Sequence, residues 1–152
     1  METALAWVEA TGVAGAVRDS LGLTASLSAI HLLGVTLVGG GALVAGLRYG
    51  GVIFADQALA AVARPAGRAI LLGVIISVGT GVLLVSPRAS ASAANGFFQL
   101  KMLCLAGAAV CDVFVRRRGY SVPGRFATPA GLMRSVLYGA VLVAGCAFIL
   151  LE

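Results

Sequence analysis

Apolar residues along this chain gather in four long blocks, without the alternation of apolar and polar faces that a surface helix shows. The blocks run from about residue 23 to 47, 67 to 85, 97 to 115 and 132 to 151. A helix that crosses a lipid bilayer needs about 20 mostly apolar residues, which is close to the length of each block. A soluble bundle would instead need a polar outer face on each helix. The pattern therefore predicts an all-α membrane protein with four transmembrane helices arranged as an up-down bundle.

The segment before the first block predicts a separate short helix. Residues 3–17 are interpreted as a helix lying in the membrane interface, with Trp7 at the depth of the lipid headgroups. Arg18, Asp19 and Ser20 then form a polar break. Either Asp19 or Ser20 can cap the first span.

Turn-forming residues separate the second and third blocks. Ser86-Pro87 ends the second block, because proline disfavours helix in the residue that precedes it. The small, polar run RASASAANG then predicts a loop, and Asn95-Gly96 predicts a turn that restarts the chain. The spans and their connections leave residues 1–152 as a single membrane domain.

Small residues at four-residue spacing predict which helix faces pack together. Helices in lipid associate through close packing, so residues that let two backbones approach are favoured at the contact. The second span carries an unbroken row of such residues and is the candidate for the centre of the bundle. The rows are Ala69, Gly73, Ser77 and Gly81 in the second span, Gly34, Ala42 and Gly46 in the first, and Gly131, Ser135 and Gly139 in the fourth.

Composition favours the membrane class over a soluble domain. Hydrophobic residues make up 60% of the 152 residues and charged residues only 11%, with a mean hydropathy of +1.03. A soluble domain of this size needs far more polar surface.

The net charge of +5 comes mainly from arginines on one side of the predicted bundle. Eight of the eleven basic residues flank the first and third connections, which an even number of spans places on the same side: Arg48, Arg64, Arg68, Arg116, Arg117, Arg118, Arg125 and Arg134. The positive-inside rule makes this side cytoplasmic, so we expect a bacterial inner-membrane protein with both termini outside. Membrane lipids are the expected partners of these arginines. Nucleic acid is not, because aromatic or groove-reading residues do not accompany them.

Three fragments in order carry a resemblance to a known family: AWVEATGVAGAVRDS, AIHLLGVTLVGGGALVAGLRYGG and GTGVLLVSPRASASAANGFFQLKMLCLAGAAV. Together they resemble an uncharacterised bacterial family of four-span membrane proteins, over the chain up to about residue 115. The aromatic entry into a lysine-bearing span is also distantly similar to the copper-resistance D-type membrane domain. That resemblance implies an acidic residue just before Leu47 and Arg48, where this chain has Gly46. The resemblance implies the fold and the topology and no activity.

The only histidine, His31, falls in the outer half of the first span, at the level of Lys101, Met102 and Cys104. Cu(I) favours imidazole, thioether and thiolate ligands, so His31, Met102 and Cys104 are candidate metal ligands. Met102 and Cys104 stand about 200° apart around one helix, so His31 can pair with at most one of them. The alternative is that His31 hydrogen-bonds a backbone carbonyl or a Ser/Thr hydroxyl between helices. Thr80 of the second span lies at a similar level.

A cofactor site has two further candidates. A chain with one histidine cannot supply two-histidine haem ligation, so a His31/Met102 pair is the option within one chain for haem b. Lys101 is expected either to extend its ammonium group to the headgroups or to bind an anionic lipid, a quinone-like or a carboxylate ligand. The spans contain no second histidine, no paired carboxylates and no phosphate-binding motif, so an enzyme acting alone is not expected.

The sequence therefore predicts a small multipass membrane protein that acts by binding or assembly. The first hypothesis is an accessory or structural subunit that forms a homo-oligomer or packs against a larger membrane complex. The second is a copper- or haem-handling protein that uses His31 with Met102 or Cys104. A transporter or channel is disfavoured because few polar residues are present to line a path.

Overall fold

The computed structural model describes residues 2–118, 133 and 135–141 of the chain. These residues form helices and short connections and no strand. The helices are α1 (Glu2–Glu9), α2 (Gly12–Asp19), α3 (Leu21–Tyr49), α4 (Leu59–Val85), the 3₁₀ helix η1 (Ser86–Arg88), α5 (Ala89–Ala94) and α6 (Gly96–Arg118). Residues 135–141 are also helical.

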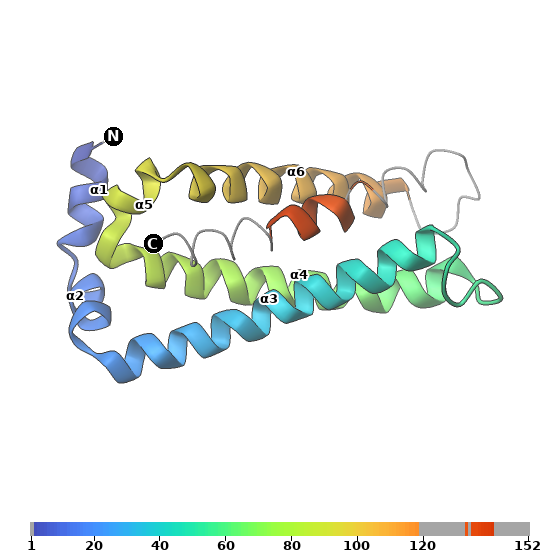
Figure 1. The fold of residues 1–152 in the computed structure, drawn as a ribbon, viewed down its shortest axis with the longest axis horizontal. Helices are drawn as coiled ribbons and strands as arrows, with labels where there is room; N and C mark the ends of the chain where they lie inside the picture. The colour runs from blue at the N-terminus through green and yellow to red at the C-terminus, as the bar shows by residue number, and fades with distance from the viewer. Residues whose placement is uncertain (1, 119–132, 134, 142–152) are drawn as a thin grey trace.

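The long helices α3, α4 and α6 run alongside one another, and the helical residues 135–141 lie among them (Figure 1). The short helices α1, α2, η1 and α5 gather at one end, which we call the capped end. Residues 50–58 connect α3 to α4 at the opposite end, the loop end. The fourth predicted span, residues 132–151, falls mostly outside the described residues, so its full course stays a prediction.

Three of the predicted helix boundaries are confirmed by side-chain caps and by proline. The Ser20 hydroxyl accepts a hydrogen bond from the Leu23 amide at 3.2 Å and so caps α3. The Asn95 side-chain oxygen accepts one from the Phe97 amide at 2.9 Å at the start of α6. The helix α4 ends at Val85, immediately before Ser86 and Pro87.

The structure differs from the sequence prediction at the capped end. The interfacial helix expected over residues 3–17 is two helices, because Thr11 starts a new one by accepting a hydrogen bond from the Ala14 amide at 3.3 Å. The run expected as a loop after Pro87 is instead η1 followed by α5. These short helices are stabilised by contacts distant in sequence, which local pattern does not reveal.

Glu9, at the end of α1, links α1 to α5. The sequence analysis did not identify this residue. Its carboxylate accepts hydrogen bonds from the Ser90 amide at 2.7 Å and the Ser90 hydroxyl at 2.8 Å. The pKa of Glu9 is lowered, chiefly by the amide and then by the hydroxyl of Ser90, with a smaller contribution from the charge of Arg18. The Arg18 guanidinium donates to the backbone oxygens of Glu9 and Pro87 at 3.3 and 3.4 Å. The capped end thereby ties the start of the chain to the α4–α6 connection.

The helices α3 and α4 touch backbone to backbone at two glycines. A methyl group added at Gly73 would lie 2.6 Å from the carbonyl oxygen of Gly34, and one added at Gly34 would lie 2.5 Å from the Ser77 hydroxyl. Both distances are shorter than real side chains tolerate, so glycine is required at this crossing. The predicted packing role of Gly34, Gly73 and Ser77 is confirmed.

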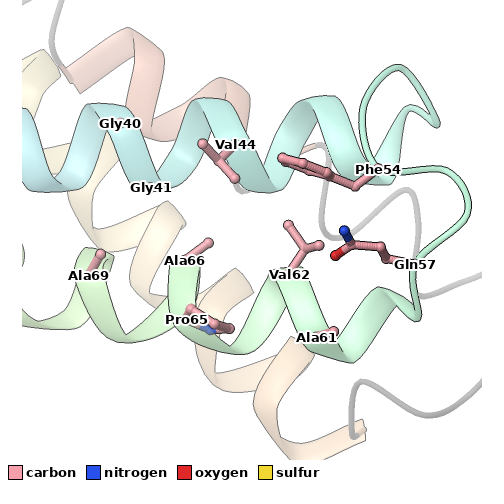
Figure 2. Close-up of a pocket in the computed structure, with 10 residues that line it drawn as sticks. All are labelled: Gly40, Gly41, Val44, Phe54, Gln57, Ala61, Val62, Pro65, Ala66 and Ala69. Carbon is pink, nitrogen blue, oxygen red and sulfur yellow. The ribbon is translucent and has the colours of Figure 1, made fainter.

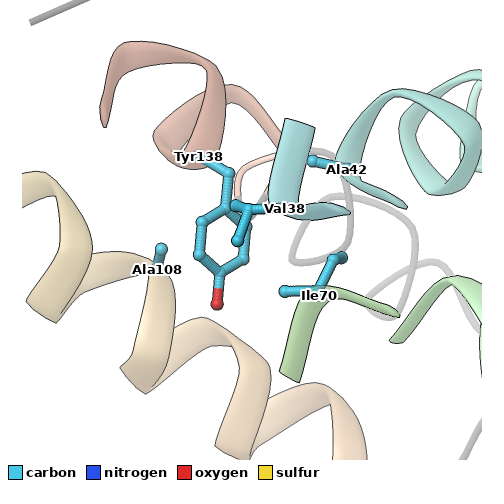
Figure 3. Close-up of a cluster of buried hydrophobic side chains, with 5 residues drawn as sticks. All are labelled: Val38, Ala42, Ile70, Ala108 and Tyr138. Carbon is cyan, nitrogen blue, oxygen red and sulfur yellow. The ribbon is translucent and has the colours of Figure 1, made fainter. Parts of the chain in front are cut away.

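The apolar core forms where four segments meet (Figure 3). Val38 and Ala42 of α3, Ile70 of α4, Ala108 of α6 and Tyr138 belong to one cluster of buried side chains. All five are buried, with Tyr138 at only 3% exposure although it is a large aromatic residue. A methyl group added at Gly46 would lie 3.1 Å from Ser135, so the segment that holds Ser135 and Tyr138 packs directly on α3. The described residues therefore form a helical bundle.

The exterior of the long helices is apolar. Two helical stretches, Leu21–Tyr49 and Leu59–Ala94, are long and apolar enough to cross a membrane, with mean hydropathies of 1.9 and 2.4. Only 28% and 22% of their most apolar windows are buried, whereas a core helix of a soluble protein would be mostly buried. Large apolar side chains point outward instead, among them Leu33 at 63% exposure and Ile75 at 61%. Gly96–Cys111 of α6 is a shorter apolar stretch.

Candidate functional site

The polar centre of the α3–α4 contact is His31, which lies in the half of the bundle nearer the capped end. Its ring sits against Gly81 of α4, where an added methyl group would lie 3.3 Å from the ring carbon Cε1. The missing side chain at Gly81 therefore makes room for the imidazole between the helices. The sequence placed Gly81 in a packing row and did not identify it as the seat of His31.

A short hydrogen-bond chain fixes the orientation of the ring. The Thr80 hydroxyl donates to the carbonyl oxygen of Ile76 at 2.7 Å, so its oxygen is left to accept. Nδ1 of His31 lies 2.9 Å from that hydroxyl oxygen. The arrangement favours the neutral tautomer that carries its proton on Nδ1 and its lone pair on Nε2. The sequence left open whether His31 binds a metal ion or hydrogen-bonds a group on a neighbouring helix. The hydrogen bond between His31 and Thr80 is present in the structure.

Burial makes this chain of hydrogen bonds important for packing. Thr80 is 9% exposed and Ser77, one turn earlier on α4, has a buried hydroxyl oxygen that makes no hydrogen bond. In an apolar surrounding, an imidazole N–H without a hydrogen-bond partner costs free energy, because no water is there to accept its proton. The pairing of His31 with Thr80 therefore ties the register of α3 to that of α4.

The other candidate ligands lie on α6. Lys101 is partly buried and close enough to His31 for its charge to act on the ring. Met102, the next residue, is 46% exposed, and Cys104 is a partly buried free thiol. The structure thus brings Lys101 toward His31, while Met102 leaves nearly half of its surface outside the bundle.

Among the described residues, no three side chains of His, Cys, Asp or Glu are grouped in a way that could hold a metal ion. The metal-ligand role of His31 with Met102 or Cys104 stays a prediction. Cys111 is a buried free thiol at the end of the apolar stretch of α6. The chemistry that the geometry provides is one neutral imidazole with a basic Nε2 and one nearby ammonium group.

These observations define a class: a small protein whose described residues form helices with an apolar exterior, with a polar pairing of His31 and Thr80 between the long helices α3 and α4. The chain belongs to a family described as a family of unknown function, DUF6644, whose model matches residues 5–144. This confirms the resemblance to an uncharacterised family and extends it past residue 115. No curated protein and no solved structure matches the chain. The likeness to the copper-resistance D-type domain is not among these findings and stays a prediction.

Proposed function

We propose that the chain is a four-span protein of the bacterial inner membrane that acts as an accessory or structural subunit, by assembly and not by catalysis. The observation that carries the proposal is the apolar exterior of α3 and α4, whose most apolar windows are only 28% and 22% buried. Water would penalise so much exposed leucine and isoleucine, whereas lipid tails or apolar helices of a partner accept it. The contact of Gly46 with Ser135 supports a fourth helix beside α3.

The orientation follows from charge. Arg48 and Arg64 lie near the loop end, and Arg68 follows one turn further along α4. The positive-inside rule assigns this end to the cytoplasm. The capped end, with α1 and α5, then faces outward. Its short helices lie across the ends of the long helices, at the depth of the headgroups (Figure 1).

Assembly has a candidate contact on α4. Most of the predicted small-residue row is used inside the chain, at Gly73 and Ser77, so it is not available to a partner. Gly79 is different, since a side chain added there would meet nothing within 4 Å. Its neighbours Ile75 and Val82 are 61% and 64% exposed, so this strip of α4 offers a close approach to another apolar helix.

Alkaline carbonate extraction followed by native mass spectrometry in mild detergent tests the proposal. The full chain should remain in the membrane fraction and should then migrate as a homo-oligomer or with a larger complex. Replacing Gly79 with leucine should reduce that assembly, while the same change at Gly40, which also faces open space, should leave it intact. A chain that carbonate extracts, or that is monomeric throughout, contradicts the proposal.

A second candidate, copper or haem handling, draws support from the tautomer of His31. Histidines that bind metals commonly donate one ring N–H to a nearby oxygen and ligate through the other nitrogen. The bond from Nδ1 to Thr80 leaves Nε2 in that state. The second ligand would be Cys104, which is partly buried, or Met102, which is 46% exposed. Purified protein that shows no haem absorbance, and binds Cu(I) no better than a His31→Ala variant, would remove this candidate.

A further inference from the structure

A shallow groove of about 440 Å³ runs between α3 and α4 near the loop end (Figure 2). Its floor is built from small or short side chains, including Gly40, Ala61, Pro65 and Ala69. Val44 and Phe54 stand over one side, at 36% and 49% exposure. The groove is open to the surroundings of the bundle. Val38 and Ala42, which form part of the buried core, do not line it.

The groove is apolar along its length and polar at its loop end. Gln57, from the connection between α3 and α4, lines that end. Arg48 follows Val44 by one helical turn and donates from a guanidinium nitrogen to the Gln57 carbonyl oxygen. A second nitrogen of the same group, Nε, is buried and makes no hydrogen bond.

The charge beside the groove has one sign. Arg64 and Arg68 are exposed on the first turns of α4, and Arg68 directly precedes the groove residue Ala69. No carboxylate among the described residues forms an ion pair with Arg48, Arg64 or Arg68. Arg48 bonds a residue that lines the groove, and Arg64 and Arg68 stand next to the groove residues Pro65 and Ala69 in the chain. Three guanidinium groups beside an apolar groove match one amphipathic ligand, which has an acidic head and a hydrocarbon tail.

We propose that this groove binds an anionic phospholipid of the membrane leaflet at the loop end. The phosphate accepts hydrogen bonds from the Arg48 guanidinium at the loop end, and the exposed Arg68 extends its long side chain toward it from further along α4. One acyl chain lies along the small residues from Ala61 to Ala69 and passes Gly40. The strained backbone of Phe54, with a φ of 50°, holds its ring beside the headgroup position. The inference rests on the proposed membrane location, since the groove must open into lipid.

Native mass spectrometry of the full chain, delipidated in detergent and titrated with lipid, tests this proposal. Phosphatidylglycerol should bind more tightly than phosphatidylcholine of the same acyl chains. Arg68→Gln should weaken phosphatidylglycerol binding about fivefold, as expected for one basic residue near a membrane surface. Arg48→Gln should have a larger effect because it also removes hydrogen-bond donors. Arg88→Gln, an exposed arginine at the capped end, is the matched control and should change nothing.

A second pair of variants probes the groove itself. A side chain at Gly40 would meet nothing within 4 Å, so Gly40→Leu fills the groove without forcing α3 and α4 apart. It should reduce binding of phosphatidylglycerol, while Gly22→Leu, equally open but on the first turn of α3 and outside the groove, should not. Glycerol phosphate without acyl chains should fail to compete.

Three results would overturn the inference: equal binding of the two lipids, equal effects of Arg68→Gln and Arg88→Gln, or full competition by glycerol phosphate. If the chain stays in the membrane after carbonate extraction but shows any of these results, only the lipid-binding inference is wrong and the proposed function is not affected. A chain that carbonate extracts removes the proposed function as well.

Discussion

Replacement of Gly73 by alanine should separate the two longest helices of the bundle. The added methyl group would lie 2.6 Å from the Gly34 carbonyl oxygen and 2.9 Å from side-chain carbons of Leu37 and Val38. Ordinary contacts of this kind begin near 3.4 Å, so α3 and α4 must move apart by most of an ångström. A gap of that size forfeits a quarter to a half of each van der Waals contact along the crossing.

We expect a loss of about 2 kcal/mol in unfolding free energy, within the range for overpacked cores. For a chain of this length, that corresponds to a fall of about 6 °C in the unfolding temperature. The matched control is Gly79→Ala on the same helix, where the methyl group meets nothing within 4 Å. The control should keep or slightly raise stability, because alanine favours helix over glycine.

Reaction of a thiol-specific fluorophore during heating gives the assay. Cys111 is 7% exposed and becomes reactive when the bundle opens, in a background where Cys104 and Cys146 are replaced by alanine. Equal unfolding temperatures for the Gly73→Ala and Gly79→Ala variants would refute the close approach of α3 and α4.

Two further predictions concern polar contacts. Thr80→Val removes the hydrogen-bond partner of His31 and should lower the unfolding free energy by about 1 kcal/mol in the same thiol assay. Thr36→Val is the control and should have a smaller effect, because the Thr36 hydroxyl is exposed and bonds only within α3. The amide and hydroxyl of Ser90 lower the pKa of Glu9. The stability that Glu9 contributes to the capped end is therefore fully present above its ordinary pKa of 4.5, and it is lost as the pH falls through the lowered pKa of the folded chain. Trp7 fluorescence in lipid nanodiscs should report this release of α1 at low pH, and a Glu9→Gln variant with an unchanged acid transition would count against the assignment.

The long helices were predictable from sequence because their signals are local. Runs of apolar residues, the Ser20 cap, the Asn95-Gly96 turn and the Ser86-Pro87 break each act within a few residues. The structure confirms them in α3, α4 and α6. The contact row that includes Gly73 was also predictable, since small residues at four-residue spacing share a helix face. Helix α4 nevertheless begins eight residues before the expected span, at Leu59.

The capped end could not be predicted in the same way. Residues 89–94 have a composition typical of a loop, and their helix forms against α1, about 80 residues earlier in the chain. The pairing of Glu9 with Ser90 is a contact of this kind, and no sequence periodicity links the two positions. Thr11 carried a signal that was available, because threonine before glycine and small residues is a common helix cap.

The candidate site was predictable in part. Depth along the spans placed His31, Thr80 and Lys101 at one level, and the structure brings His31 against Thr80 and close to Lys101. The space that Gly81 leaves for the His31 ring depends on how α3 and α4 cross, so it could not be predicted from the sequence. The metal-ligand role of Met102 and Cys104 stays a prediction.

Cysteine accessibility in spheroplasts tests the membrane topology most directly. In a chain without native cysteines, one cysteine replaces Ala94 at the capped end or Asp56 at the loop end, both exposed positions. A maleimide that cannot cross membranes should label Ala94→Cys in intact spheroplasts and Asp56→Cys only after permeabilisation. Labelling of Asp56→Cys in intact spheroplasts would contradict the account.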